Sequence, residues 1–210
     1  MKNLGILLMT LLAAATVVAG CRQQAPARAE PAQPKLPPPK RICFVAFADF
    51  PSTQIQSLVD YYHEKLKLEV ETGPALRIPD NAVDAARQQL IAERLVEGAR
   101  AARADLAGNP HAVLIAFTDQ DIYPLGENWQ FAFGWRDETA RTAVVSSARM
   151  DLHYPDEPAD VARPEIRLRK IVTKDIGILY YHLPQNGNPH SVLYNGILGI
   201  QELDMVGEDF

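Results

Sequence analysis

The sequence predicts an α/β fold, a mixed β-sheet packed with helices, and three observations support this class. Two apolar runs, residues 41–50 and 111–119, are typical of buried strands. Apolar residues at helical spacing separate these runs and return in residues 163–183. Two short runs, residues 130–135 and 142–147, flank a turn-like RDETAR segment and predict a hairpin. Helices that alternate with strands before a hairpin favour a mixed sheet covered by helices.

The first twenty residues predict a lipoprotein signal peptide, which is set aside before the fold is considered. Lys2 supplies the positive start, an apolar run follows, and residues 18–21 (VAGC) resemble a bacterial lipobox. We therefore expect a lipidated Cys21, a chain anchored in the cell envelope and, because Arg22 follows, the outer membrane where one exists. An ordinary signal peptide is the alternative. A membrane-spanning helix is disfavoured because the run is shorter than about 20 residues.

Residues 21–40 are expected to form a tether between the lipid on Cys21 and the domain. After Cys21 this segment is rich in Pro and Ala and holds no aromatic or β-branched residue. It cannot bury enough apolar surface to offset the entropy lost on ordering. Its prolines favour an extended, semi-stiff polyproline II conformation. A proline-binding partner is the weaker alternative.

Residues 41–210 predict a single domain that is long enough to bury a core. The first forty residues hold five of the 21 basic residues and one of the 26 acidic ones, which leaves a net charge of −9 for the domain. That charge argues against nucleic acid or an anionic membrane surface as its main ligand. With Cys21 lipidated, Cys43 has no intrachain disulfide partner, and its apolar neighbours predict a buried thiol.

Spacing and capping residues predict the remaining elements of the N-terminal half. Residues 52–66 predict a helix capped by Ser52, and residues 68–72 alternate as a short strand. A long helix is expected over residues 82–106, capped by residue 80 or 81.

The C-terminal part of the chain predicts a helix, a turn and a returning helix. Pro164 fits a first helical turn, because its missing N–H is not needed there. The helix should end near Leu183, because Pro184 disfavours helical geometry in the residue before it. The turn-rich segment QNGNP follows, and residues 191–204 are expected to return as a second helix.

Two blocks of sequence together resemble the archaemetzincin family of zinc metalloproteases. The first holds a TD-x-D-[LI]-Y segment (residues 118–123), an F-x-FG strand (residues 131–134) and a strand that ends in S-x-AR (residues 146–149). The second, residues 163–204, lies where the family has its zinc motif. The resemblance implies a metzincin-like mixed sheet with helices, in a single domain that follows the signal peptide and the Pro-rich tether.

The resemblance also implies where a zinc site should lie. The family motif HExxHxxGxxH supplies three zinc ligands, a general base and a glycine hinge. Aligned on the shared I/L-G pair, the helical histidine positions hold Lys174 and Ile178, and the general-base position holds Asp175. Tyr181 stands at the glycine hinge and Pro184 at the third ligand. An ammonium and an aliphatic side chain cannot bind a divalent cation, so we expect neither zinc nor the family's activity.

A rearranged metal site is the alternative. His182 and His190 flank the QNGNP segment, where they are the histidines placed to meet Asp175 or Asp204. The second hypothesis is therefore an active metal-dependent peptidase that holds zinc on these side chains; exposed loop histidines are the simpler interpretation.

Asp119 and Asp121 form the other pair of carboxylates that we considered. An acid–base pair is one interpretation of this spacing. We instead expect turn and capping groups, one of which pairs with Arg149. No nucleophile elbow or phosphate-binding loop is present in the sequence.

The leading functional hypothesis is a catalytically inactive, lipid-anchored domain that binds an extended peptide or an envelope protein in a cleft beside a sheet edge. No cofactor is expected, and a structural envelope lipoprotein is the third hypothesis. Two arrangements are open for Lys174: an ammonium paired with Asp204 or Glu202 in place of the metal, or a side chain that extends into solvent over apolar neighbours.

Overall fold

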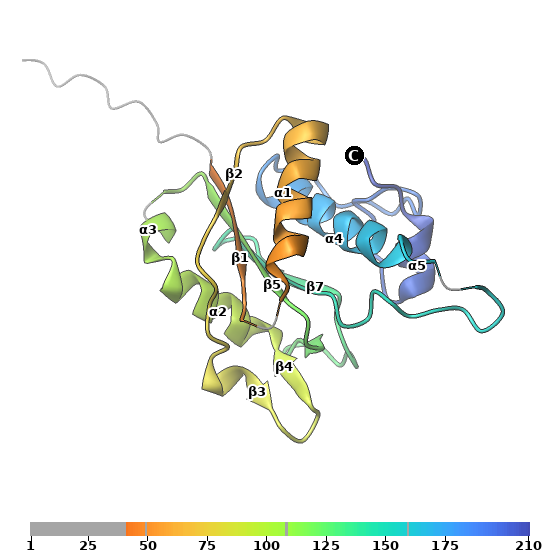
Figure 1. Cartoon of the computed structure of the whole chain (residues 1–210), viewed down its shortest axis with the longest axis horizontal. Coiled ribbons are helices and arrows are strands. Elements are labelled where there is room, and N and C mark those ends of the chain that lie inside the picture. The colour runs from red at the N-terminus through yellow and green to blue at the C-terminus, as the bar shows by residue number, and fades with distance from the viewer. Residues whose placement is uncertain (1–40, 49, 108, 159) are drawn as a thin grey trace, which may run out of the picture. The chain divides into compact units, whose positions relative to one another are not determined.

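The structure is a computed structural model that describes residues 41–48, 50–107, 109–158 and 160–210 (Figure 1). The predicted signal peptide, the predicted lipidation of Cys21 and the predicted tether lie outside these residues. Within the described ranges, no helix is both long and apolar enough to cross a membrane.

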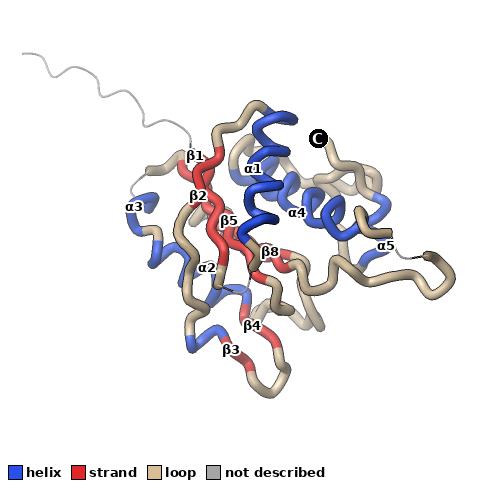
Figure 2. Tube along the Cα trace, viewed as in Figure 1, coloured by secondary structure: helices blue, strands red, loops and turns tan. Residues whose placement is uncertain are grey.

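A five-stranded mixed sheet has the strand order β2-β1-β5-β8-β7. Strands are drawn in red in Figure 2. Its strands are β1 (Arg41–Ala46), β2 (Val70–Thr72), β5 (Ala112–Thr118), β7 (Gly134–Asp137) and β8 (Thr142–Ser146). Neighbouring strands from β2 to β8 run parallel, whereas β7 pairs antiparallel with β8 and forms one edge. The α/β class predicted from the sequence is confirmed.

The predicted hairpin is confirmed, but its first strand lies later in the chain. Arg136 and Asp137 extend the ladder opposite Ala143 and Thr142 instead of starting the turn. The turn tightens after them because an Asp137 carboxylate oxygen accepts the backbone N–H of Ala140 at 2.8 Å. An acidic side chain that satisfies a turn N–H in this way favours a short connection.

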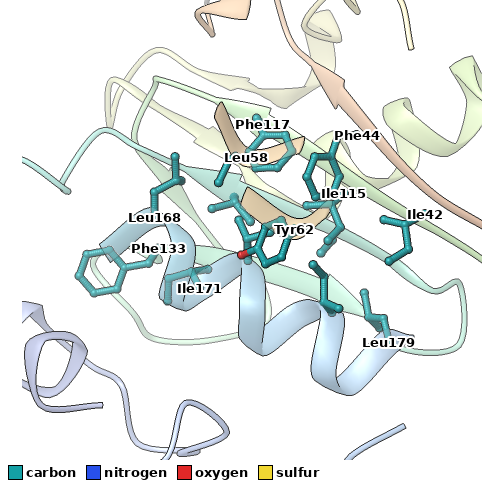
Figure 3. Packing of buried hydrophobic residues seen from close by; sticks show 14 of the residues in the cluster. Ile42, Phe44, Leu58, Tyr62, Ile115, Phe117, Phe133, Leu168, Ile171 and Leu179 are labelled. Atoms are coloured by element: carbon teal, nitrogen blue, oxygen red, sulfur yellow. The ribbon is translucent and has the colours of Figure 1, made fainter. Parts of the chain in front are cut away.

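Helices cover both faces of this sheet, which explains why its central strands read as continuous apolar runs. On one face, Ile42 and Phe44 pack with residues of α1 (Ser52–Leu66) and α4 (Arg163–Leu179). Figure 3 shows Leu58 and Tyr62 of α1 among the residues of this cluster. On the other face, Cys43 and Val45 pack with residues of α2 (Ala92–Ala102). Cys43 is buried, as predicted, and its sulfur lies 2.6 Å from Arg103 Nη1.

The long helix predicted over residues 82–106 is wrong. This region instead contains the 3₁₀ turn η1 (Asp80–Ala82), strands β3 (Val83–Asp84) and β4 (Gln89–Ile91), then α2 and the short α3 (Ala104–Ala107). The Asp84 carboxylate accepts the backbone N–H groups of Ala86 and Arg87, which favours a turn over a helix. In addition, β4 pairs with the distant strand β6 (Ile122–Tyr123), a contact that helical periodicity does not reveal.

Two predicted helix caps are also wrong. Pro51 precedes α1 in an extended conformation, and no side chain caps that helix. Neither residue 80 nor residue 81 caps α2, because α2 begins only at Ala92, after β4. The predicted strand at residues 68–72 is present over its last three residues as β2.

Helix α4 begins with Pro164 in its first turn, as predicted, but ends at Leu179 rather than near Leu183. The chain reverses before the proline: His182 has a positive φ of 58°, and the Leu183 N–H donates to the Gly177 carbonyl at 2.9 Å. The predicted second helix is reduced to α5 (Ile200–Met205). Residues 186–195 instead close a loop through backbone bonds between Asn186 and both Leu193 and Asn195.

A buried ion pair fixes this returning segment to α4. The Arg167 side chain is only 1% exposed and donates to both Asp204 oxygens, at 2.8 and 2.6 Å. It also donates to the carbonyl oxygens of Met150 and Leu152. Burial works to raise the pKa of Asp204, but the bonds from Arg167 and Tyr154 outweigh it and lower that pKa below its ordinary value. The carboxylate is therefore held in its charged form.

We expect Asp204→Ala to lower the free energy of unfolding by roughly 3–5 kcal/mol, because it leaves the buried Arg167 charge unpaired. Urea melts at pH 7 measure the loss. Asp209→Ala is the matched control, since Asp209 pairs with Lys65 at the exposed surface and its loss should cost little. Equal midpoints for the two variants would show that the Arg167 pair does not hold the segment.

Candidate functional site

A groove of about 560 Å³ is the candidate site. Residues 129–136, which end in the edge strand β7, supply one wall. Lys174 and Asp175 of α4 and residues 195–198 of the returning segment contribute the rest of the lining. The fold therefore brings two of the positions assigned from the sequence, Lys174 and Asp175, to a groove beside a sheet edge.

The backbone of β7 offers free hydrogen-bonding groups along this groove. The Ser146 N–H donates to the Phe133 carbonyl at 2.9 Å, so these two residues form a hydrogen-bonded pair of the antiparallel ladder. Hydrogen-bonded pairs alternate along such a ladder. Gly134 and Arg136 therefore direct their N–H and C=O groups away from β8, and no described strand pairs with that edge.

Gly134 also allows β7 to approach α4 closely. A Cβ atom at this position would lie 3.2 Å from Ile171 Cγ2 and 3.1 Å from the Val144 carbonyl oxygen. Both distances are shorter than ordinary van der Waals contacts, so a larger residue would push β7 and α4 apart. The glycine thus helps to set the width of the groove at this point.

Lys174 adopts neither of the two arrangements considered from the sequence. Its side chain is buried rather than extended into solvent, and its ammonium donates to the backbone carbonyl of Tyr194. No carboxylate among the described residues lies within ion-pair distance of it; Asp204 pairs with Arg167 instead. Burial is the main cause that lowers the pKa of Lys174 to about 8, and the nearby Arg136 guanidinium is the second cause. Lys174 is therefore a buried cation without a protein counter-ion in direct contact.

Asp175 is buried and only partly satisfied. Its Oδ1 accepts from Arg136 Nη1 at 3.2 Å, whereas the buried Oδ2 has no hydrogen-bond partner in the described chain. Burial raises the pKa of Asp175 to about 6, although Arg136 and Lys174 act in the opposite direction. Arg136 was not identified from the sequence. It stands 39 residues from Asp175, and only the packing of the hairpin on α4 brings the two together.

The other three aligned positions do not face one common site. Ile178 is part of the apolar core on the α1 and α4 side of the sheet. Tyr181 packs its ring against Phe210, with centroids 5.3 Å apart, and Pro184 is exposed. The left-handed residue that reverses the chain is His182, one position after the assigned hinge.

The structure does not assemble the alternative metal site. His182 Nε2 lies 3.0 Å from Arg141 Nη2, His190 is exposed, and Asp204 is engaged by Arg167. Within the described ranges, no group of three His, Cys, Asp or Glu side chains is placed to hold a metal ion. Lys174, Ile178 and Pro184 supply no zinc donor either, so the residues present at the aligned site do not fit zinc.

Arg149 pairs with Asp121 through two bonds, at 2.9 and 2.6 Å. The expectation that Arg149 pairs with one of the two adjacent carboxylates is confirmed. A bidentate pair of this kind supports the interpretation of Asp121 as a structural group rather than as an acid–base catalyst.

The mixed sheet, its antiparallel edge strand and the helix followed by a reversed segment define an α/β domain. The chain is similar to archaemetzincin from Archaeoglobus fulgidus, solved with malonate (21% identity, TM-score 0.63, 81% of this chain and 94% of that one). It is also similar to archaemetzincin from Methanopyrus kandleri (23% identity, TM-score 0.64, 81% of this chain and 88% of that one). A zinc-dependent peptidase from Methanocorpusculum labreanum is a third similar structure (19% identity, TM-score 0.67, 80% of this chain and 95% of that one).

These similarities confirm the archaemetzincin-like fold expected from the sequence. No protein-family model matches the chain, and no curated protein does. Identities of 19–23% establish a shared fold alone, so the function must be argued from the site.

Lys174→Met should change how stability depends on pH. In the folded protein the pKa of Lys174 is about 8, below its ordinary value of 10.5. Between these values the unfolded chain binds more protons, so the stability of the wild type rises with pH. The rise is on the order of 3 kcal/mol, since one pKa unit corresponds to about 1.4 kcal/mol. Urea melts at pH 7, 8.5 and 10 should show this rise for the wild type relative to the variant. Parallel pH profiles would show that the ammonium is not desolvated.

Proposed function

We propose that this protein is a lipid-anchored, catalytically inactive relative of the metalloproteases with this fold, and that it binds an extended peptide along β7. The peptide belongs to another chain, such as an envelope protein. One observation carries the proposal: the free backbone groups of Gly134 and Arg136 open onto a groove that Lys174 also lines.

Strand addition is the binding mode that this geometry favours. An extended peptide that pairs with the free edge of a sheet gains main-chain hydrogen bonds, while pockets beside the edge select its side chains. Gly134 and Arg136 each supply one donor and one acceptor. Trp129 and Leu198, which are 43% and 68% exposed, line the same groove and offer apolar surface to the side chains of the peptide.

The chemistry of the site supports binding rather than hydrolysis. A zinc peptidase needs several neutral or anionic ligands around one ion and a general base beside it. The aligned positions offer an ammonium, an aliphatic side chain and a proline. Asp175 stands at the general-base position, but its carboxylate is buried and bound to Arg136.

Replacing Arg136 tests the strand-addition mode. The ligand is a peptide selected from a randomised pool of N-acetylated hexapeptide amides, and binding is followed by tryptophan fluorescence. Both tryptophans of the chain, Trp129 and Trp135, line the groove and report on it. Arg136→Pro removes the outward N–H without removing a bond to β8, so it should weaken binding at least about tenfold. Arg136→Ala is the control because it keeps that N–H.

Equal binding by the proline and alanine variants would contradict strand addition. Hydrolysis of the peptide, together with one tightly bound zinc per chain purified without a His tag, would instead support the alternative of an active metal-dependent peptidase. A protein that binds neither peptide nor zinc would favour the third hypothesis, a structural envelope lipoprotein.

The anchor is tested separately through Cys21. The VAGC sequence at residues 18–21 supports acylation of this cysteine, and Cys21→Ser removes the thiol that accepts the lipid. The full-length wild type should sediment with membranes, whereas Cys21→Ser should not be lipidated and should leave that fraction. Identical fractionation of the two proteins would rule out the lipid anchor.

A further inference from the structure

Three cations of α4 are buried, and they differ in how fully the protein satisfies them. Arg167 is bound by the Asp204 carboxylate and by two carbonyl oxygens. The Lys170 ammonium donates to the carbonyl oxygens of Leu203 and Asp204, at 3.1 and 3.0 Å. Lys174 donates to a single carbonyl, and it is the member of this set that lines the groove.

We propose that Lys174 and Arg136 form a subsite that binds a carboxylate of the peptide in the groove. This inference rests on the proposed peptide-binding function and names the ligand group that the groove selects.

Both cations keep unused hydrogen-bond donors. The Lys174 ammonium carries three N–H bonds, of which Tyr194 takes one. Arg136 uses Nη1 for Asp175, and its Nε makes only a long contact of 3.5 Å with Glu138. Its Nη2 has no acceptor among the described residues. A carboxylate has two oxygens that can accept from both cations at once, through charge-assisted hydrogen bonds.

The balance of charge also favours an anion. Lys174 and Arg136 contribute two positive charges, against which Asp175 contributes one buried negative charge that is already bound to Arg136. Glu138 is largely exposed, with 60% of its side chain accessible. A desolvated ammonium without a counter-ion is costly, and a ligand carboxylate would supply that counter-ion. Asp175 acts as a positioning residue, since it holds the Arg136 guanidinium against α4.

The test compares three forms of one hexapeptide that differ in the charge at the C-terminal end. The hexapeptide is selected from two randomised pools of N-acetylated peptides, one with free C-terminal acids and one with C-terminal amides. It is then made as the C-terminal amide, as the free acid, and as the amide with a terminal Glu. At pH 7 at least one of the two charged forms should bind the wild type roughly tenfold tighter than the neutral amide. Preference for the free acid assigns the subsite to the peptide C-terminus, and preference for the Glu form assigns it to an acidic side chain.

Matched variants test whether the preference for the charged peptide depends on Lys174. Lys174→Met should abolish the preference for the charged peptide, whereas Lys65→Met, the same change at an exposed lysine outside the groove, should retain it. If Lys174→Met does not fold, the pH dependence of the wild type serves instead. The preference should fall as pH rises from 7 to 9.5, because Lys174, with a pKa of about 8, loses its proton there. The other charged groups that line the groove are Arg136, Asp175 and Glu138.

Three outcomes would contradict the inference. If the charged and neutral forms bind the wild type equally well, the carboxylate subsite is wrong while the proposed peptide binding stands. If no peptide from either pool binds, the proposed function fails and the subsite fails with it. A preference that survives in a folded Lys174→Met variant would also exclude Lys174 from the subsite.

Discussion

The attachment of the returning C-terminal segment to α4 is the interaction on which the rest of the site depends. Arg167, Lys170 and Lys174 stand at i, i+3 and i+7 and therefore share one face of the helix. Each of them binds that segment, through the Asp204 carboxylate or through backbone carbonyl oxygens. Cations at these positions hold residues 194–204 against the helix, and this in turn places one wall of the groove.

The same arrangement explains the unusual state of Lys174. A lysine at the middle of a helix ordinarily keeps its ammonium in water. Here the ammonium is bound by Tyr194 of the returning segment, and Arg136 of the hairpin lies nearby. The result is two cations beside a free strand edge, in a domain whose formal net charge is −9.

Similarity of fold does not by itself imply similarity of chemistry. Structures of zinc enzymes share its architecture at about one fifth identity, because layers of helices on a mixed sheet tolerate extensive substitution in the core. A metal site has no such tolerance: replacing an imidazole by an ammonium reverses the interaction with a cation. The groove of this protein is lined by the residues that lead into the sheet edge, by α4 and by the returning segment.

The sequence by itself determined the parts of the fold that depend on local pattern. Apolar runs identified β1 and β5, the spacing around the polar turn identified the hairpin, and Pro164 marked the start of α4. Only the tertiary structure decided what depends on contacts between distant residues. Leu90 joins a strand because it pairs with Ile122, although its spacing also fits a helix. Arg136 meets Asp175, and Lys174 meets a backbone carbonyl instead of a carboxylate, because the fold brings the hairpin and the returning segment to α4. Such contacts leave no periodic signal in the sequence, since their partners are 20 to 39 residues apart.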